Sequence, residues 1–329
     1  RFRLENTLVI APPLDFSHFV RRILRAAKPR LLVLVEGEVW PNLIREAVRA
    51  GVPVALVSGR ITEKSLARWS RFGKFSRSVW GGITLALMQS EADAERARRL
   101  GVAPRNVRAA GNMKFDFFPP AHAEAEVPPA EGRPVVAAGS VRQGEEAAVL
   151  DAFVQIKREF PNALLYLAPR HPEKSEAALA FEKTKKRFRM IRWNEKVKNG
   201  DFQDADVVWV DAMGVLVGIY ARADAVFVGG SLLPYGGHNI LEPAFFGKPI
   251  VAGPHMENFK GIAEMFRERG ALLEARDAGE LAERMLELLR DEKLRRELGE
   301  RGRKILAENR GVTEKIAAAL APYLEGGAA

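Results

Sequence analysis

The chain has 329 residues, with 51 Lys or Arg against 42 Asp or Glu, so its formal net charge is +9. It contains no cysteine, which excludes a disulfide scaffold, a thiolate-bound zinc ion, an iron–sulfur cluster and a cysteine nucleophile. The length predicts two domains, and the 47% hydrophobic and 28% charged residues exclude a disordered or collagen-like chain.

Short apolar runs rich in β-branched residues alternate with amphipathic segments along the whole chain, which is the pattern of βα units around parallel sheets. No run approaches the roughly 18 to 20 residues that span a bilayer. The predicted strands are 31–35, 53–57, 84–88 and 106–110, then 135–138, 163–168, 207–210, 224–228, 249–252 and 271–274. The predicted helices include 143–159, 173–186, a pair within 278–307, and 311–323. We therefore predict an α/β fold.

A proline-rich segment separates the two series of strands. Residues 116–134 contain five prolines and little apolar periodicity, which is typical of an exposed connector. We predict a first domain over 1–118, a linker over 119–134 and a second domain over 135–329. Ligands of open parallel sheets bind beside the carboxyl ends of the strands, so we expect a ligand cleft between the two domains.

Charged residues follow two predicted strands of the first domain. Glu36 and Glu38 come directly after strand 31–35, and Pro41 suits the first turn of the helix that follows. One of the two acids could favour the N-terminus of that helix. The other is then a candidate acid/base or charge-stabilising group, and Lys114 places a cation near the same cleft.

The strongest local signal follows strand 224–228. Glycine pairs at 229–230 and 236–237 precede a helix start, so exposed backbone N–H groups are expected to bind an anion such as phosphate. The alternative is a capping box, in which Asn239 caps the helix and Glu242 reaches back. For Glu242 alone the two interpretations are equally favoured, whereas the doubled glycines and the neighbouring histidine favour a ligand for the loop.

Two further loops follow strands of the second domain. Ser140 opens the first, and taken alone the spacing from Ser140 to Gln143 favours a capping box. In the second, Pro169 and Pro172 fix the loop around Arg170, whose planar guanidinium suits phosphate or carboxylate. The alternative for Arg170 is a surface salt bridge, which contributes little to stability.

Several other classes are disfavoured by the sequence itself. It has no P-loop, no Gly-x-Gly-x-x-Gly and no Gly-x-Ser-x-Gly motif. The histidines, His238 among them, show no metal-ligand spacing, and Asp204 with Asp206 is interpreted as a chance Asp-x-Asp because it precedes a strand. We predict no metal, no cofactor and, in the absence of a nucleic-acid-binding motif, no nucleic-acid partner.

Residues 60–80 carry six basic residues against one acid, and four aromatics recur there at roughly helical spacing: Trp69, Phe72, Phe75 and Trp80. This combination predicts a membrane-surface patch. Equally favoured is the alternative that the aromatics belong to the core and the cations form a solvated face. A second basic cluster lies within residues 21–30.

Six motifs together resemble those of bacterial 3-deoxy-D-manno-octulosonic acid (Kdo) transferases. They are residues 36–43, 112–116, Ser140 with 144–146, 169–173, 211–214 and 236–242, and they come in the order found in that family. The match extends from about residue 8 to residue 324. So many motifs in one order make a chance match implausible.

The resemblance implies the GT-B fold, with two Rossmann-like domains. It implies transfer of Kdo from CMP-Kdo to lipid IVA with inversion and without a bound metal, at the cytoplasmic face of the inner membrane of Gram-negative bacteria. Glu36 and Lys114 would then stabilise the transition state. The substrate-binding residues would be Ser140, Pro169, Arg170, Met213, Gly214, Val215, Gly237, His238, Asn239, Ile240, Leu241 and Glu242.

Two departures from the family pattern accompany this resemblance. The family's catalytic base is a Glu in a Gly-Glu motif upstream of residue 1, so we expect this sequence to lack the base and the first βα units of its first domain. Val215 stands where the family usually has Glu, so a side-chain contact is lost there while backbone contacts can remain. The alternatives are another GT-B enzyme that uses a UDP-sugar, as a transferase or an epimerase, and a non-catalytic nucleotide-binding fragment.

Overall fold

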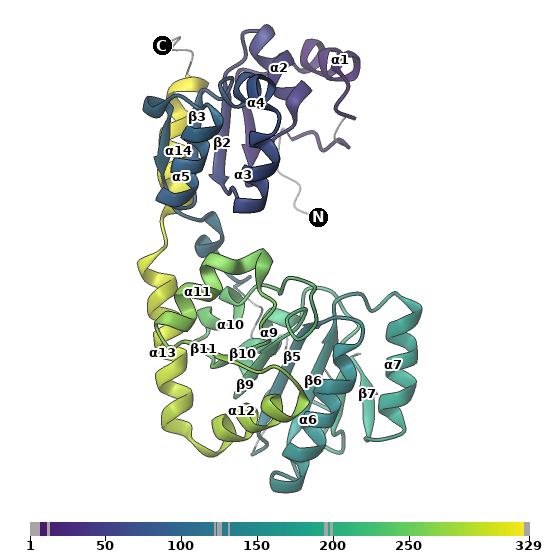
Figure 1. The fold of residues 1–329 in the computed structure, drawn as a ribbon. Helices are drawn as coiled ribbons and strands as arrows, with labels where there is room; N and C mark the ends of the chain where they lie inside the picture. The colour runs from purple at the N-terminus through teal and green to yellow at the C-terminus, as the bar shows by residue number, and fades with distance from the viewer. Residues whose placement is uncertain are drawn as a thin grey trace. The chain divides into compact units, whose positions relative to one another are not determined.

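The computed structural model describes residues 7–11, 14–121, 123, 127–130, 132–193, 197 and 200–325. The chain forms two compact units, which Figure 1 shows as ribbons. Unit 1 comprises Arg1–Asp116 and Asn309–Ala329, and unit 2 comprises Phe117–Glu308. Each unit has a parallel sheet covered by helices, which confirms the predicted α/β class.

Unit 1 is built on a four-stranded parallel sheet in the order β1-β2-β3-β4. Its strands are β1 (Leu32–Val35), β2 (Val54–Gly59), β3 (Leu85–Met88) and β4 (Val107–Ala109). Its helices are α1 (Ser17–Ala27), α2 (Pro41–Arg49), α3 (Glu63–Ser70), α4 (Gly73–Trp80), α5 (Glu91–Leu100) and α14 (Val312–Leu324), with 3₁₀ turns η1 (Pro104–Asn106) and η2 (Met113–Asp116). All six residues of β2 are buried, as expected for a central strand covered on both faces.

Unit 2 is built on a seven-stranded parallel sheet in the order β11-β10-β9-β5-β6-β8-β7. The strands are β5 (Val135–Val141), β6 (Leu164–Pro169), β7 (Met190–Arg192), β8 (Val207–Trp209), β9 (Ala225–Val228), β10 (Ile250–Ala252) and β11 (Leu272–Glu274). The helical elements are α6 (Glu145–Glu159), α7 (Ser175–Lys185), α9 (Leu216–Arg222), α10 (Leu241–Phe245), η3 (Glu257–Phe259), α11 (Lys260–Glu268), α12 (Ala278–Arg290) and α13 (Glu292–Glu308). Strands β9, β5 and β6 lie side by side at the centre of this sheet.

Close packing at the carboxyl end of β5 depends on a glycine. A Cβ atom added to Gly139 would lie 1.9 Å from the hydroxyl oxygen of Tyr220, a residue of α9 that is fully buried. Only a residue without a side chain allows this approach. The large apolar side chains Phe153, Trp209 and Phe227 fill the core around the same sheet.

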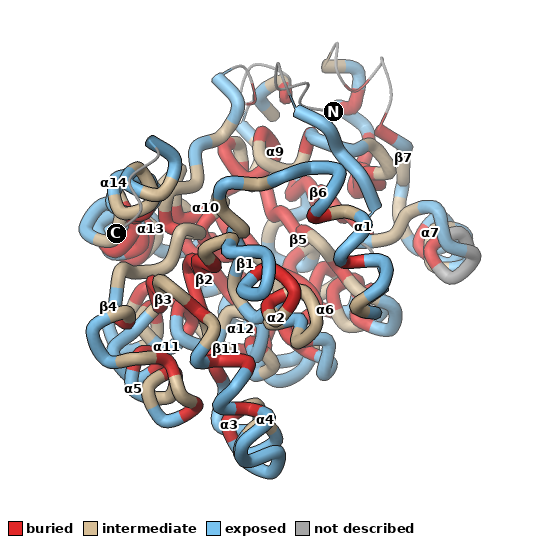
Figure 2. Tube along the Cα trace, turned by 90° about the horizontal axis from the view of Figure 1, so that it is seen from above, coloured by how far each residue is buried: buried red, intermediate tan, exposed pale blue. Residues whose placement is uncertain are grey.

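Buried residues follow the central strands, and the outer faces of α3, α4 and α7 are largely exposed (Figure 2). Every predicted strand is present, and one further strand, β7, was not predicted. This strand has only three residues at the edge of the sheet, and all three keep some exposure to solvent, so it lacks a recognisable apolar pattern. Among the helices formed by described residues, none is long and apolar enough to cross a membrane.

The predicted linker is not an exposed connector throughout. Ala123 and Val127 are buried within unit 2, and the Nε–H of Arg222 donates a 2.9 Å hydrogen bond to the carbonyl of Val127. Gly218 leaves room for this segment, because a Cβ there would lie 2.0 Å from the carbonyl oxygen of Ala123. Proline content indicates irregular backbone, but it does not reveal that small apolar residues among the prolines join a core.

The predicted second domain, 135–329, also differs from the structure at its end. Residues 309–329 belong to unit 1, where Val312 and Ile316 of α14 pack against Val57 and Leu87. The carboxylate of Asp116 accepts hydrogen bonds from the N–H groups of residues 311 and 313, at 2.6 and 2.5 Å, and so caps α14. An amphipathic pattern shows that a helix has a buried face, but not which sheet covers it.

Candidate active site

The candidate donor-binding residues of unit 2 lie at the carboxyl ends of its central strands. Arg142 follows β5, Pro169 ends β6 and Arg170 follows it, and the loop with His238 follows β9. Because β9, β5 and β6 are neighbours in a parallel sheet, their following loops lie along one edge.

A buried carboxylate organises the first glycine pair of the loop after β9. Glu145 is fully buried at the start of α6, and its carboxylate accepts hydrogen bonds from the N–H groups of Gly230 (2.6 Å), Ser231 (2.8 Å) and Leu232 (2.8 Å). It also accepts one from the N–H of Arg142 (2.8 Å). The expectation that the N–H groups of this glycine loop bind a phosphate is therefore wrong for residues 230–232, because an internal anion already occupies them.

The second glycine pair leads into a locally hydrogen-bonded turn. Gly237 donates to the carbonyl of Gly230 (2.7 Å), and the side chain of Asn239 accepts from the N–H of Leu241 (3.1 Å). The Asn239 amide also donates to the Glu242 carboxylate (3.2 Å), while Ile240 is buried beside it. This arrangement agrees only in part with the predicted capping box. Glu242 contacts the side chain of Asn239, whereas in a capping box it would accept the backbone N–H of Asn239. Burial raises the pKa of Glu242.

His238 packs over Gly230 together with Arg142. A Cβ on Gly230, whose φ is +68°, would lie 2.8 Å from His238 Cδ2 and 3.3 Å from Arg142 Cγ. Burial, followed by the positive charges of Arg170 and Arg142, lowers the pKa of His238 to about 4, so its ring is neutral at pH 7. Its Nε2 is buried and has no hydrogen-bond partner among the described residues.

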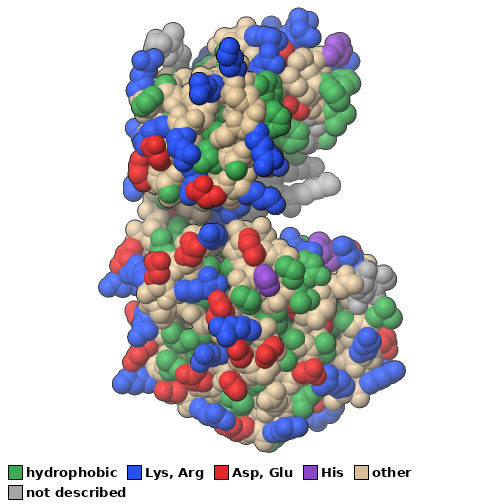
Figure 3. Space-filling view, viewed as in Figure 1, with side chains coloured by type: hydrophobic (Ala, Val, Ile, Leu, Met, Phe, Trp, Pro, Cys, Tyr) green, Lys and Arg blue, Asp and Glu red, His purple; other side chains and the backbone are tan. Residues whose placement is uncertain are grey.

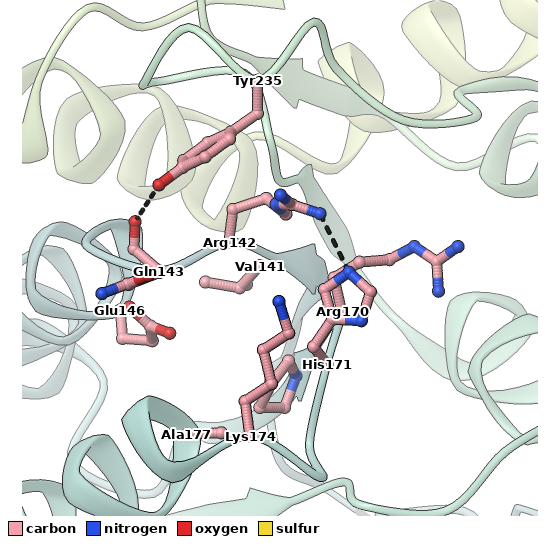
Figure 4. Close-up of a pocket in the computed structure, with 10 residues that line it drawn as sticks. Val141, Arg142, Gln143, Glu146, Arg170, His171, Lys174, Ala177 and Tyr235 are labelled. Atoms are coloured by element: carbon pink, nitrogen blue, oxygen red, sulfur yellow. Dashed lines mark hydrogen bonds between the residues drawn. The ribbon is translucent and has the colours of Figure 1, made fainter.

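Arg142 is fixed on two sides (Figure 4). Its guanidinium carbon lies 4.5 Å from the centre of the Tyr235 ring, and its Nη1 lies 3.0 Å from Nε2 of His171. The hydroxyl of Tyr235 donates to the carbonyl of Gln143 (3.0 Å). Since a guanidinium can only donate, Nε2 of His171 accepts, and the opposite ring nitrogen faces Glu173 at 3.2 Å.

These side chains border a pocket, which we call the cationic pocket. Figure 4 shows the amino group of Lys174 pointing into it, and the side chain of Arg170 extending away from Lys174. Arg142, Arg170 and Lys174 form no ion pair with any residue that the structure describes, so the salt-bridge alternative for Arg170 is not observed. The lining residues are Val141, Arg142, Gln143, Glu146, Pro169, Arg170, His171, Lys174, Ala177 and Tyr235.

In the segment after β8, residues 213–215 offer a ligand mainly backbone groups. Met213 is 82% exposed, and Gly214 adopts a φ of +88°, which favours glycine. Val215 is 7% exposed and directly precedes α9. The residue that departs from the family pattern thus joins the apolar core, and only the backbone around it remains for a ligand.

Ser140 lies at an irregularity of β5 and does not cap a helix. Its φ is +55°, and the pairing of β5 with β6 shifts register between Ala138 and Val141. Helix α6 begins at Glu145 after Gly144, so the capping box predicted from Ser140 is not formed. Left-handed backbone at a residue other than glycine is strained, and such strain concentrates at functional sites.

In unit 1 the structure brings Glu36 and Lys114 together. Oε1 of Glu36 lies 2.7 Å from Nζ of Lys114, and each side chain is about one third exposed. Glu36 follows β1 with a φ of +58°, another strained position at a strand end. The second acid is occupied elsewhere, since Glu38 accepts a 2.7 Å hydrogen bond from the indole of Trp40.

A hydrogen-bonded network holds the segment that carries Lys114. The N–H of Lys114 donates to Oδ1 of Asn112 (3.0 Å), and the amide of Asn112 donates to Gln89 (3.1 Å). Gln89 in turn donates to the carbonyl of Ser58 (3.0 Å), whose hydroxyl accepts from the N–H of Met113 (3.3 Å). The ends of β2 and β3 therefore position η2, and sequence spacing gave no signal for this network.

The N-terminus of α2 is bound by a third acid. The carboxylate of Asp15 accepts from the N–H groups of Asn42 (3.1 Å) and Leu43 (2.8 Å). The expectation that Glu36 or Glu38 favours this helix end is wrong, because Asp15 occupies its donors. Asp15 precedes Asn42 by 27 residues, a separation at which local capping patterns give no signal.

Comparisons with known proteins agree with this architecture. Residues 1–117 match the family model described as 3-deoxy-D-manno-octulosonic-acid transferase (kdotransferase), and residues 147–305 match glycosyl transferases group 1. Among solved structures, the C-terminal CMP-Kdo binding domain of WaaA from Acinetobacter baumannii is 32% identical, with a TM-score of 0.50, and the match covers 54% of this chain and 91% of that one. The UDP co-structure of S. aureus MnaA has a TM-score of 0.60 at 14% identity over 94% and 80% of the two chains, which shows the fold alone.

The two units and these matches define a glycosyltransferase of the GT-B fold, as the resemblance implied. The 3-deoxy-D-manno-octulosonic acid transferase of Haemophilus influenzae is 32% identical over 95% of this chain and 74% of its own length. That of Bordetella pertussis is 34% identical over 95% and 73%. The chain belongs to the family of 3-deoxy-D-manno-octulosonic acid transferases.

Proposed function

We propose that the protein transfers Kdo from CMP-Kdo to lipid IVA, with inversion and without a bound metal, at the cytoplasmic face of the inner membrane. Family membership and the similarity to a CMP-Kdo binding domain support the donor. The observation that carries the proposal is the set of three cations in the loops that follow β5 and β6 of unit 2. Arg142, Arg170 and Lys174 have no ion-pair partner among the described residues, so they are available to an anionic nucleotide sugar.

We propose a role in binding CMP-Kdo for each motif of unit 2. Arg170 provides a bidentate fork for the phosphate of CMP, and Pro169 fixes the turn that presents it. The backbone of residues 213–215 and the turn 239–242 contact the rest of the nucleotide. Within this turn, burial raises the pKa of the Glu242 carboxyl, which accepts a hydrogen bond from the side chain of Asn239. His238 is neutral and adds no charge beside the arginines.

Catalysis is proposed to be electrostatic. As the bond between the anomeric carbon and the phosphate oxygen breaks, negative charge grows on CMP and positive charge grows on the sugar ring. Arg170 and Lys114 offset the first, and the carboxylate of Glu36 offsets the second. The 2.7 Å ion pair between Glu36 and Lys114 holds both side chains in place before substrate binds.

Nucleotide binding by the wild-type chain separates this proposal from the UDP-sugar alternative. We expect titration calorimetry to detect binding of CMP and much weaker binding of UDP. Arg170→Ala should weaken CMP binding about tenfold or more, because a hydrogen-bonded charge pair with phosphate is lost. Arg158→Ala, at an exposed arginine in the last turn of α6, is the matched control and should bind CMP like the wild type. Tight UDP binding without CMP binding would contradict the proposed donor.

A membrane contact is proposed for α3 and α4 of unit 1. Phe72 and Phe75 are 58% and 43% exposed with ring centres 6.4 Å apart, whereas Trp80 is buried and stacks edge to face with Trp69. The tryptophans therefore belong to the core, as the alternative held, and the two phenylalanines do not. Lys and Arg side chains surround exposed apolar groups on the visible face of unit 1 (Figure 3). Exposed aromatics among cations suit the headgroup region of an anionic bilayer.

Replacing both phenylalanines tests this contact. Phe72→Ser with Phe75→Ser should lower the fraction of protein that sediments with anionic vesicles at least about fivefold, because apolar area no longer enters the bilayer. Leu179→Ser in α7 of unit 2, where the side chain is 64% exposed, is the control and should sediment like the wild type. Equal sedimentation of the double variant and the wild type would show that α3 and α4 do not bind the membrane.

A further inference from the structure

The cationic pocket offers more positive charge than one phosphate requires. Arg170 extends to one side of the loop after β6, whereas Arg142 and Lys174 lie with His171 on the side of the pocket (Figure 4). The acids nearby do not pair with these two cations: Glu173 faces His171 at 3.2 Å, and Glu146 accepts the N–H of Gly144 at 2.8 Å. Clustered cations repel each other, and a bound anion removes that cost.

The proposed donor carries two anionic groups close together. One is the phosphate that joins the sugar to the nucleoside, and the other is the carboxylate of the octulosonic acid, which is attached to the same anomeric carbon. A site for such a molecule needs two neighbouring places for anions. We propose that the pocket formed by Arg142, His171 and Lys174 binds the carboxylate of the transferred sugar, beside the phosphate site at Arg170; this inference rests on the proposed function.

The fixed orientation of Arg142 suits it to bind a carboxylate. The stacking on Tyr235 and the hydrogen bond to His171 fix its guanidinium, while Glu145 fixes its backbone N–H. A guanidinium held in one orientation loses little freedom when it binds a carboxylate, and its fork matches the two oxygens. Lys174, which points into the pocket from the start of the α7 segment, adds a second donor.

Glu146 also lines the pocket, and as an ionised group it would repel a carboxylate. Burial raises the pKa of Glu146, which favours its protonated form. The three cations that line the pocket outnumber this one acid, so the pocket has a net positive charge even when Glu146 is ionised.

The dissociation constants of CMP and CMP-Kdo, measured on the same variants, test the inference. Arg142→Lys, which keeps the charge but loses the fork, and Lys174→Met should each weaken CMP-Kdo binding about tenfold or more. Their affinity for CMP should change by less than about twofold, since CMP lacks the carboxylate. Arg170→Ala is the matched comparison and should weaken both ligands.

The outcomes are distinct. Preferential loss of CMP-Kdo binding supports the carboxylate site. Equal weakening of both ligands, or unchanged binding of both, overturns it while leaving the proposed donor intact. Failure of the wild type to bind CMP would instead overturn the proposed function. Melting temperatures show whether a variant is folded, and Lys174→Met at an exposed residue provides a second variant if Arg142→Lys unfolds.

Discussion

Glu145→Gln is expected to lower the free energy of unfolding of unit 2 by about 3–5 kcal/mol, which is typical when one partner of a buried charged network is removed. Each carboxylate oxygen of Glu145 accepts N–H groups from the loop after β9 or from Arg142. A glutamine side chain would place its own NH₂ against some of these donors. Buried N–H groups without an acceptor then carry their full desolvation cost.

Urea unfolding, monitored by fluorescence, measures this loss of free energy. The hydrogen-exchange rates of the amides at 230–232 show whether the loss originates in this loop. Glu146→Gln is the matched control, because Glu146 is the next residue, is also buried, and accepts the backbone N–H of Gly144. It should cost about 1 kcal/mol or less, since the amide oxygen can replace the acceptor. Equal stability of the Glu145 variant and the wild type would show that the loop does not depend on the buried carboxylate.

Glu36→Gln is expected to lower the rate of Kdo transfer about 100-fold or more, the scale seen when one preorganised electrostatic group is removed from a transition state. The change removes the negative charge that we propose faces the reacting sugar, and it keeps the size of the side chain. The assay is transfer from CMP-Kdo to lipid IVA by the protein as its gene encodes it. Donor binding should change little, because the proposed role concerns the transition state.

Glu38→Gln provides a control two residues away on the same loop. Its carboxylate binds the indole of Trp40 rather than Lys114, so transfer should stay within about twofold of the wild type, as for other surface changes away from a site. Lys114→Met should reduce transfer as Glu36→Gln does, and the double variant should lose little more, because groups that act as a unit are not additive. Full activity of Glu36→Gln would contradict its proposed role.

Most of the fold follows from periodicity in the sequence. The strands of both sheets are short apolar runs, and their positions were predictable because a buried parallel strand needs apolar residues on both faces. Two features were not predictable. Strand β7 is short and partly exposed, and α14 lies against the sheet that precedes it by more than 200 residues. Both depend on tertiary neighbours, which a local pattern does not contain.

The candidate site shows the same limit. Arg170, Glu36 and Lys114 were proposed because they are charged residues in segments that follow strands, and motif order linked them to a family. The doubled glycines were predicted to bind a phosphate, but the anion that the N–H groups of residues 230–232 contact is the carboxylate of Glu145. Composition cannot distinguish an internal carboxylate from a ligand. Arg142 was passed over because nothing local shows that Tyr235 and His171 meet it.

The place of α14 also sets the order in which the protein can be completed during synthesis. Residues 117–308 are contiguous, so unit 2 has all of its chain available once they have left the ribosome. The sheet of unit 1 is made earlier, yet Val57 and Leu87 stay uncovered until Ile316 emerges. Of the two units, the one whose sheet is translated earlier is thus completed later, and its uncovered apolar face is exposed to aggregation in the interval.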